Sequence, residues 1–182
     1  MNRLIQLMPV LAGLAVVSPA LYGQTKARVV VPSNRVLPMG GSTTLSAISA
    51  SPSTISFTAT DPDAGPYAGS SAATVSWTTS SGSTGNTWSL SVQASAATFA
   101  SCGTVPTSAV KATCTGVAGG SAGTCGAAVN LSTSAQQVAN GNEASGAGKA
   151  YSVTLNFSLA DSWSYIANSS CSLTLTYTVT AP

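Results

Sequence analysis

The last twelve residues of the sequence are Cys171-Ser-Leu-Thr-Leu-Thr-Tyr-Thr-Val-Thr-Ala-Pro182, in which apolar and hydroxyl-bearing side chains alternate without interruption. Successive side chains of a β-strand point to opposite faces, so this pattern predicts a strand with one apolar face and one threonine-rich face. Such a strand buries its apolar face and leaves the other face in solvent. We therefore expect a fold that is built from half-buried strands.

The same period of two recurs along the chain. Residues 151–159 form the longest other alternation, while residues 161–167 favour a helical turn or an ordered loop. Together these runs predict an all-β protein, a single antiparallel two-layer β-sandwich of the immunoglobulin-like type with about seven to nine strands. Shorter alternating runs that end in turn residues lie at residues 55–60, 74–78, 88–94, 110–114 and 129–133.

The start of the chain is organised differently from the rest. Residues 1–23 contain Arg3, an apolar run and then small residues, which is the layout of a secretory signal peptide and too short for a comfortable membrane span. Residues 24–52 are interrupted by prolines and glycines and predict an N-terminal arm with short strands, and residues 53–182 form the β-sandwich domain. The glycine-rich segments 116–126 and 140–148 predict surface loops.

Charge is scarce in this sequence. Only 5% of the residues are charged, against about 25% in ordinary soluble domains. Five Lys or Arg and four acids remain after residue 23, too few and too dispersed to attract nucleic acid or an acidic membrane. We therefore expect a secreted protein, extracellular or periplasmic, that has no nucleic-acid partner and no membrane span once the signal peptide is cleaved.

Four cysteines in an exported chain without histidine indicate two disulfides. We favour Cys102 with Cys171, because the end of one strand lies beside the start of its antiparallel neighbour. Cys114 with Cys125 would then close the loop that contains Gly119 and Gly120. The crossed pairing remains open.

Catalytic signals are weak in this chain. With no histidine, the usual base for a serine or cysteine nucleophile is missing, so we expect no enzymatic activity and no cofactor. Asp61 and Asp63 could offer oxygen ligands to calcium, but a turn around Pro62 explains them better, and no metal site is predicted. The carboxylates available for glycoside hydrolysis are Asp61, Asp63, Glu143 and Asp161.

The aromatic residues divide into two groups. Trp77 and Trp88 are in phase with aliphatic neighbours, which predicts that they pack in the core. Trp163 and Tyr165 lie where the alternation stops, next to polar residues, and are the candidate glycan-binding pair because aromatic faces bind the apolar side of a sugar ring.

Two motifs resemble those of the WxL bacterial cell-surface domain. Trp88-Ser-Leu90 is a Trp-x-Leu tripeptide, and near the end of the chain Tyr177 and Val179 stand where the family has its second Trp and Leu. The distal Trp is thus a tyrosine here, and the four cysteines are outside the family pattern. The resemblance implies a β-rich module that attaches non-covalently to cell-wall peptidoglycan, with Trp88, Leu90, Tyr177 and Val179 as structural positions. Residues 131–134 and 151–155 resemble the middle strands, so the similarity runs from about Thr74 to Pro182.

The alternating C-terminus also resembles fimbrial subunits and spore-coat-U-like secreted sandwiches, in which a strand from a neighbour completes the sheet. Residues 26–37 would be the donated strand, although Pro32 and Pro38 argue against a long one. The sequence thus predicts a non-catalytic cell-surface or wall-associated structural protein. Its partners would be wall polysaccharide, peptidoglycan or other surface proteins, including copies of itself. The alternatives are a polymerising fimbrial subunit and a glycan-binding module.

Overall fold

The computed structural model describes residues 25–30, 35–38, 45, 48–59, 64–79, 85–120, 122–146, 148–165 and 171–181. The expected signal peptide, Asp61 and Asp63 lie outside these residues. The described part is all-β, with fifteen strands and one short 3-10 helix, η1 (Thr107–Ala109). The strands are β1 (Thr25–Val30), β2 (Arg35–Pro38), β3 (Ser49–Ser51), β4 (Thr54–Ala59), β5 (Tyr67–Ala68), β6 (Ala73–Thr79), β7 (Thr87–Ala94), β8 (Thr98–Phe99), β9 (Cys102–Pro106), β10 (Val110–Ala118), β11 (Ala122–Cys125), β12 (Val129–Asn130), β13 (Gln136–Asn142), β14 (Lys149–Leu159) and β15 (Cys171–Ala181).

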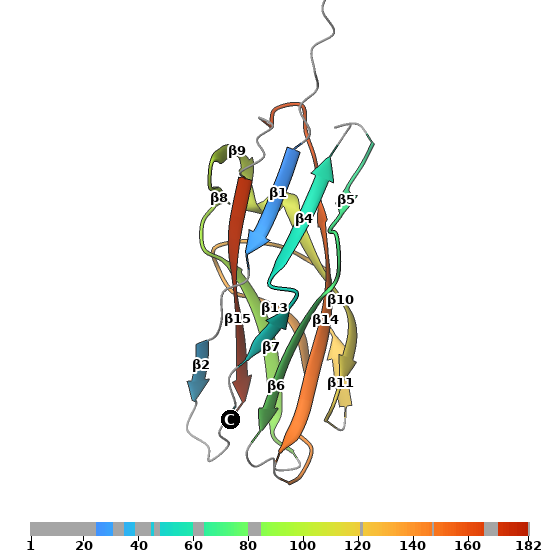
Figure 1. Cartoon of the computed structure of the whole chain (residues 1–182). Coiled ribbons are helices and arrows are strands. Elements are labelled where there is room, and N and C mark those ends of the chain that lie inside the picture. Colours follow the sequence, from blue (N-terminus) through green and yellow to red (C-terminus); the bar gives the residue numbers. More distant parts are fainter. Residues whose placement is uncertain are drawn as a thin grey trace, which may run out of the picture.

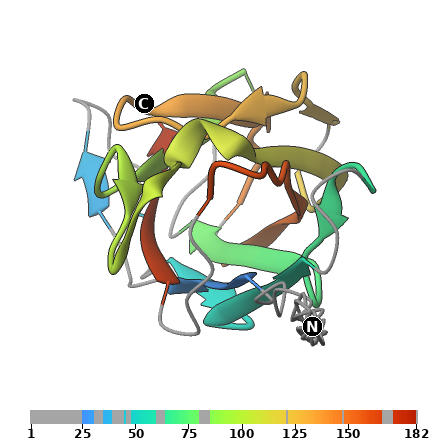
Figure 2. The same cartoon turned by 90° about the horizontal axis from the view of Figure 1, so that it is seen from above.

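The strands form two main sheets that face each other (Figures 1 and 2). The seven-stranded sheet has the order β11-β13-β7-β15-β1-β4, and β2 also pairs with β15. The six-stranded sheet has the order β12-β10-β14-β6-β3, and β5 also pairs with β14. Strands β8 and β9 form a separate hairpin beside the start of β15. The predicted all-β class and its antiparallel two-layer arrangement are confirmed.

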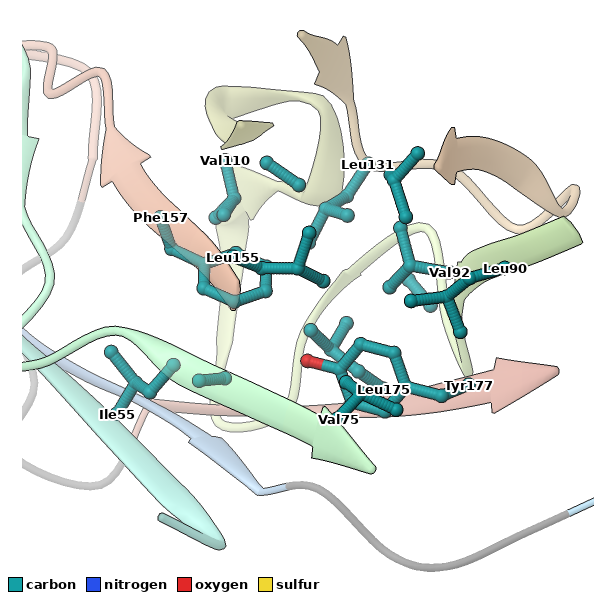
Figure 3. Close-up of a cluster of buried hydrophobic side chains, with 14 of the residues drawn as sticks. Ile55, Val75, Leu90, Val92, Val110, Leu131, Leu155, Phe157, Leu175 and Tyr177 are labelled. Carbon is teal, nitrogen blue, oxygen red and sulfur yellow. The ribbon is translucent and has the colours of Figure 1, made fainter. Parts of the chain in front are cut away.

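The alternation in the sequence corresponds to the two faces of each long strand. In β15 every odd-numbered residue from Cys171 to Ala181 is buried, and every even-numbered residue between them is half-buried. Strand β14 buries alternate residues from Tyr151 onwards, and β7 does so from Trp88. The buried faces of both sheets contribute to one hydrophobic cluster, part of which is drawn in Figure 3.

The N-terminal arm is integrated into the seven-stranded sheet. Strand β1 lies between β4 and β15, antiparallel to β4 but parallel to β15, with Ala27 opposite Cys171. Strand β2 pairs further along β15, also in parallel. These are the only parallel pairs among the described strands, and the sequence pattern did not predict them.

Two other expectations about the strands were wrong. The described residues contain fifteen strands instead of about seven to nine, because many are short, two- to five-residue segments without a clear alternation. The expected loop 116–126 is mostly strand: β10 continues to Ala118 in the six-stranded sheet, and β11 begins at Ala122 in the seven-stranded sheet, so the short connection passes from one sheet to the other. The glycines allow this tight connection, since Gly119 and Gly120 have φ of 85° and 75°. Likewise, β13 extends to Asn142, inside the expected loop 140–148.

Candidate functional site

The disulfides join elements that are distant in the sequence. Cys102, at the start of β9, is bonded to Cys171, at the start of β15. Cys114 on β10 is bonded to Cys125 on β11, so this bond links the two main sheets to each other. These are the two pairs that the sequence favoured, and no described cysteine is free. Disulfides are compatible with an extracellular protein.

The four positions of the Trp-x-Leu resemblance lie in the core. Trp88, Leu90, Tyr177 and Val179 are each at most 2% exposed. Strands β7 and β15 are adjacent, and their register places Leu90 opposite Val179 and Val92 opposite Tyr177. Because these side chains are enclosed, they can hold the two strands together but cannot touch a ligand at the surface.

Three aromatic rings connect the two sheets at one end of the sandwich. Trp77 on β6 stacks on Tyr151 of β14, with ring centroids 5.6 Å apart. Trp77 and Tyr151 each make an edge-to-face contact with Trp88 on β7, with ring centroids 5.1 Å and 6.1 Å from that of Trp88, respectively. The Tyr151 hydroxyl accepts a hydrogen bond of 2.9 Å from the backbone N–H of Ala144. This cluster confirms the predicted core role of Trp77 and Trp88.

Glu143 is a fully buried carboxylate beside this cluster, which the sequence did not indicate. Its backbone N–H donates to the Asn86 carbonyl oxygen at 2.8 Å, and the Asn86 side-chain amide donates to Glu143 Oε2 at 3.4 Å. These bonds fasten the end of β13 to the residue before β7. One backbone bond and one side-chain bond thus hold Asn86 and Glu143 together at this end of the sandwich.

The two described carboxylates cannot act as a pair. Glu143 lies near Tyr151, whereas Asp161 lies beyond the far end of β14. The ten residues from Tyr151 to Asp161 span roughly 30 Å at the usual rise of a strand. Glycoside hydrolysis needs two carboxyl groups about 5 to 9.5 Å apart. The geometry therefore gives these two residues no joint role in that chemistry.

Trp163 and Tyr165 lie on a turn that follows β14. Ser162 organises the turn: its carbonyl oxygen accepts from the N–H of Tyr165 at 3.0 Å, and its backbone N–H donates to Asp161 Oδ1 at 2.8 Å. Trp163 is 58% exposed, the only large hydrophobic side chain exposed in the described part of the chain. Tyr165 is half-buried against the core. The turn thus presents one aromatic ring, Trp163, to solvent.

The outer face of the six-stranded sheet contains a shallow groove of about 460 Å³. We call it the serine groove. Its floor comes from β6 and β14, and its two sides from β3 and from the end of β10 together with Gly119. Among the described residues, no Lys, Arg, Asp or Glu lines it. The lining residues are Ser49, Ser76, Trp77, Thr78, Ala118, Gly119, Ala150, Tyr151 and Ser152. This groove could not be predicted from the sequence, because the residues that line it come from four separate strands.

Two kinds of site are absent from the described part of the chain. No three His, Cys, Asp or Glu side chains come close enough together there to hold a metal ion. The same residues include no helix of the length and apolarity needed to cross a membrane. No protein-family model, curated protein or solved structure is significantly similar to this chain.

Proposed function

We propose that this protein is a non-catalytic structural protein of the bacterial cell surface, exported and associated with the cell wall. The observation that carries the proposal is the contrast between its two kinds of surface. The inner faces of the two sheets pack against each other in the core. The outer faces of the long strands carry serine, threonine and asparagine with almost no charge. Neutral faces of this kind suit association with polysaccharide or with other protein surfaces, since interface cores are depleted in charge.

Sedimentation with purified sacculi tests this proposal. We expect the exported form to sediment with sacculi and to remain in the supernatant without them. Protein that has been reduced and unfolded is the control, and it should lose the association because the neutral faces exist only in the folded sheets. Folded protein that stays soluble and monomeric beside sacculi, whole cells and itself would contradict the proposal.

A polymerising, fimbria-like subunit is the second candidate, and the position of β1 favours it. Strand β1 is an interior strand of its sheet although it comes from the N-terminal arm. Without it, β15 and β4 would each have an unpaired edge, which another chain can fill. The arm runs as two short strands of six and four residues, as expected for a segment that contains Pro32 and Pro38.

Deleting residues 24–37 tests the second candidate. The shortened protein should no longer assemble with itself, and it should bind an added peptide of residues 24–37. Electron microscopy and gel filtration of concentrated protein report filaments or exchanged oligomers. A scrambled peptide is the control. Full-length protein that forms filaments equally well with and without the arm would exclude exchange of this strand.

A further inference from the structure

We propose that the serine groove binds a neutral polysaccharide chain that lies across the strands of the six-stranded sheet. The inference goes beyond the structural role proposed above, because it assigns a ligand class and a site. It starts from the register of the strands. Ser49 on β3 is opposite Ser76 on β6, and Ser76 is opposite Ser152 on β14. Ala118 on β10 is opposite Ser152 and continues the same row.

These three serines, which we call the serine row, point to the outer face. Their chain neighbours Val75, Trp77, Tyr151 and Val153 are all buried. Adjacent strands are about 4.7 to 4.9 Å apart, so the row offers one hydroxyl group at each such step. That step is close to the length of one pyranose ring in an extended chain. Each sugar of a chain lying across the strands can therefore meet one hydroxyl group.

The hydroxyl groups of the serine row are available for a ligand. Within the described residues, none of the three side-chain hydroxyl groups has a hydrogen-bond partner. In the seven-stranded sheet, by contrast, the hydroxyl groups of Ser89 and Thr180 are hydrogen-bonded to each other at 2.6 Å. Polar groups that can both donate and accept are suited to the hydroxyl groups of a sugar.

The other properties of the groove select the ligand class. The methyl groups of Ala118 and Ala150 provide the apolar contact that the C–H side of a sugar needs. No charged side chain lines the groove, so nothing compensates the charge of a uronic acid or a phosphate-bearing polymer. Its volume of about 460 Å³ is within the range of small-molecule sites. A neutral glycan satisfies all three conditions.

The walls of the groove are fixed by local structure. A Cβ atom on Gly119 would overlap the carbonyl oxygen of Ala150, so only glycine allows the chain that follows β10 to lie this close to β14. Beneath the floor, the stacked rings of Trp77 and Tyr151 hold β6 and β14 in place. The groove is therefore a preformed feature of the sheet, which reduces the entropic cost of binding.

Titration with cellohexaose and chitohexaose, followed by amide chemical shifts, tests the inference in the exported protein. We expect saturable shifts at Ser76 and Ser152, and none of comparable size with hexagalacturonate. The decisive variant is Ala150→Trp, which fills the groove from an exposed position. Its matched control is Asn156→Trp, an exposed position on the same face of β14 outside the groove. The first should weaken binding at least about tenfold, and the second by less than about twofold.

A second variant tests the inference even if Ala150→Trp fails to fold. The double change Ser76→Ala and Ser152→Ala removes two hydroxyl groups without adding bulk, and it should also weaken binding about tenfold. Absence of binding to both neutral hexasaccharides, or binding that Ala150→Trp and the double change leave intact, would overturn the inference. So would binding that is abolished by Trp163→Ala alone, because the ligand would then lie on the turn after β14. Sedimentation of Ala150→Trp with sacculi separates this result from the proposed function, since wall association through other surfaces would persist.

Discussion

At the scale of single residues, Tyr177 has a hydroxyl group that is buried without a hydrogen-bond partner among the described residues. It comes from β15 and points into the shared interior (Figure 3). Burial raises the pKa of this hydroxyl above its usual value, because a phenolate would be poorly solvated there. Such a group costs stability relative to a well-packed phenyl ring.

We therefore expect Tyr177→Phe to raise the free energy of unfolding by about 1 kcal/mol at neutral pH. The pKa of Tyr177 is higher in the folded state than in the unfolded state. With respect to this group, the free energy of unfolding is therefore constant below the unfolded pKa of about 10 and falls as the pH rises from there toward the folded pKa, because the unfolded state ionises first. Urea unfolding between about pH 8 and pH 11 measures this loss. Tyr165→Phe is the control at a half-buried position, and equal alkaline losses in wild type and Tyr177→Phe would contradict the prediction.

Gly119 is the second residue with a specific backbone requirement. Its φ is 85°, and an added Cβ would also meet the backbone of β14. We expect Gly119→Ala to lower the free energy of unfolding by about 2 kcal/mol or more. Gly116→Ala, three residues earlier on β10, is the matched control, because nothing lies within 4 Å of its added Cβ and its φ is not positive. Equal urea midpoints for the two variants would show that the stability of the fold does not depend on the close approach of Gly119 to β14.

At the scale of elements, the two disulfides close loops of different length. The separation is 69 residues for Cys102 and Cys171 and 11 residues for Cys114 and Cys125. In the chain-entropy model the longer loop contributes about 4 kcal/mol and the shorter about 2 to 3 kcal/mol. Replacing Cys102 and Cys171 by serines should therefore lower the free energy of unfolding more than replacing Cys114 and Cys125 does, as measured by urea unfolding. A larger loss for Cys114 and Cys125 would mean that the link between the two sheets contributes more to stability than loop length does.

The elements that could be predicted from sequence are those with one buried and one solvent-facing side. Strands β7, β14 and β15 are long and half-buried, so their alternation is visible without any tertiary information. Strands β3 and β11 were not predicted, since their described side chains are exposed or half-buried and show no buried face. The parallel position of β1 was also missed, because pairing between residues near 27 and 171 leaves no local pattern.

At the scale of the whole molecule, one candidate site could be predicted from the sequence and the other could not. The exposure of Trp163 could be predicted, since it lies where a regular alternation stops. The serine row could not, because Ser49, Ser76 and Ser152 become neighbours only through the register of three strands. In a chain so rich in serine, no single hydroxyl group stands out. The arrangement of strands, and not the residue type, defines the groove.

The low charge of the molecule leads to a last prediction, about salt. Only 5% of the residues are charged, so screening has few interactions to weaken. Surface ion pairs contribute at most about 1 kcal/mol each. We expect the free energy of unfolding to change by less than about 0.5 kcal/mol between about 20 mM and 300 mM sodium chloride, as measured by urea unfolding. Sodium sulfate at the same ionic strength is the comparison, because it strengthens the burial of apolar surface and should stabilise the fold. A loss of stability in sodium chloride would contradict the prediction. It would mean that the few charged groups stabilise the sandwich more than its apolar interior and its hydroxyl-bearing outer faces do.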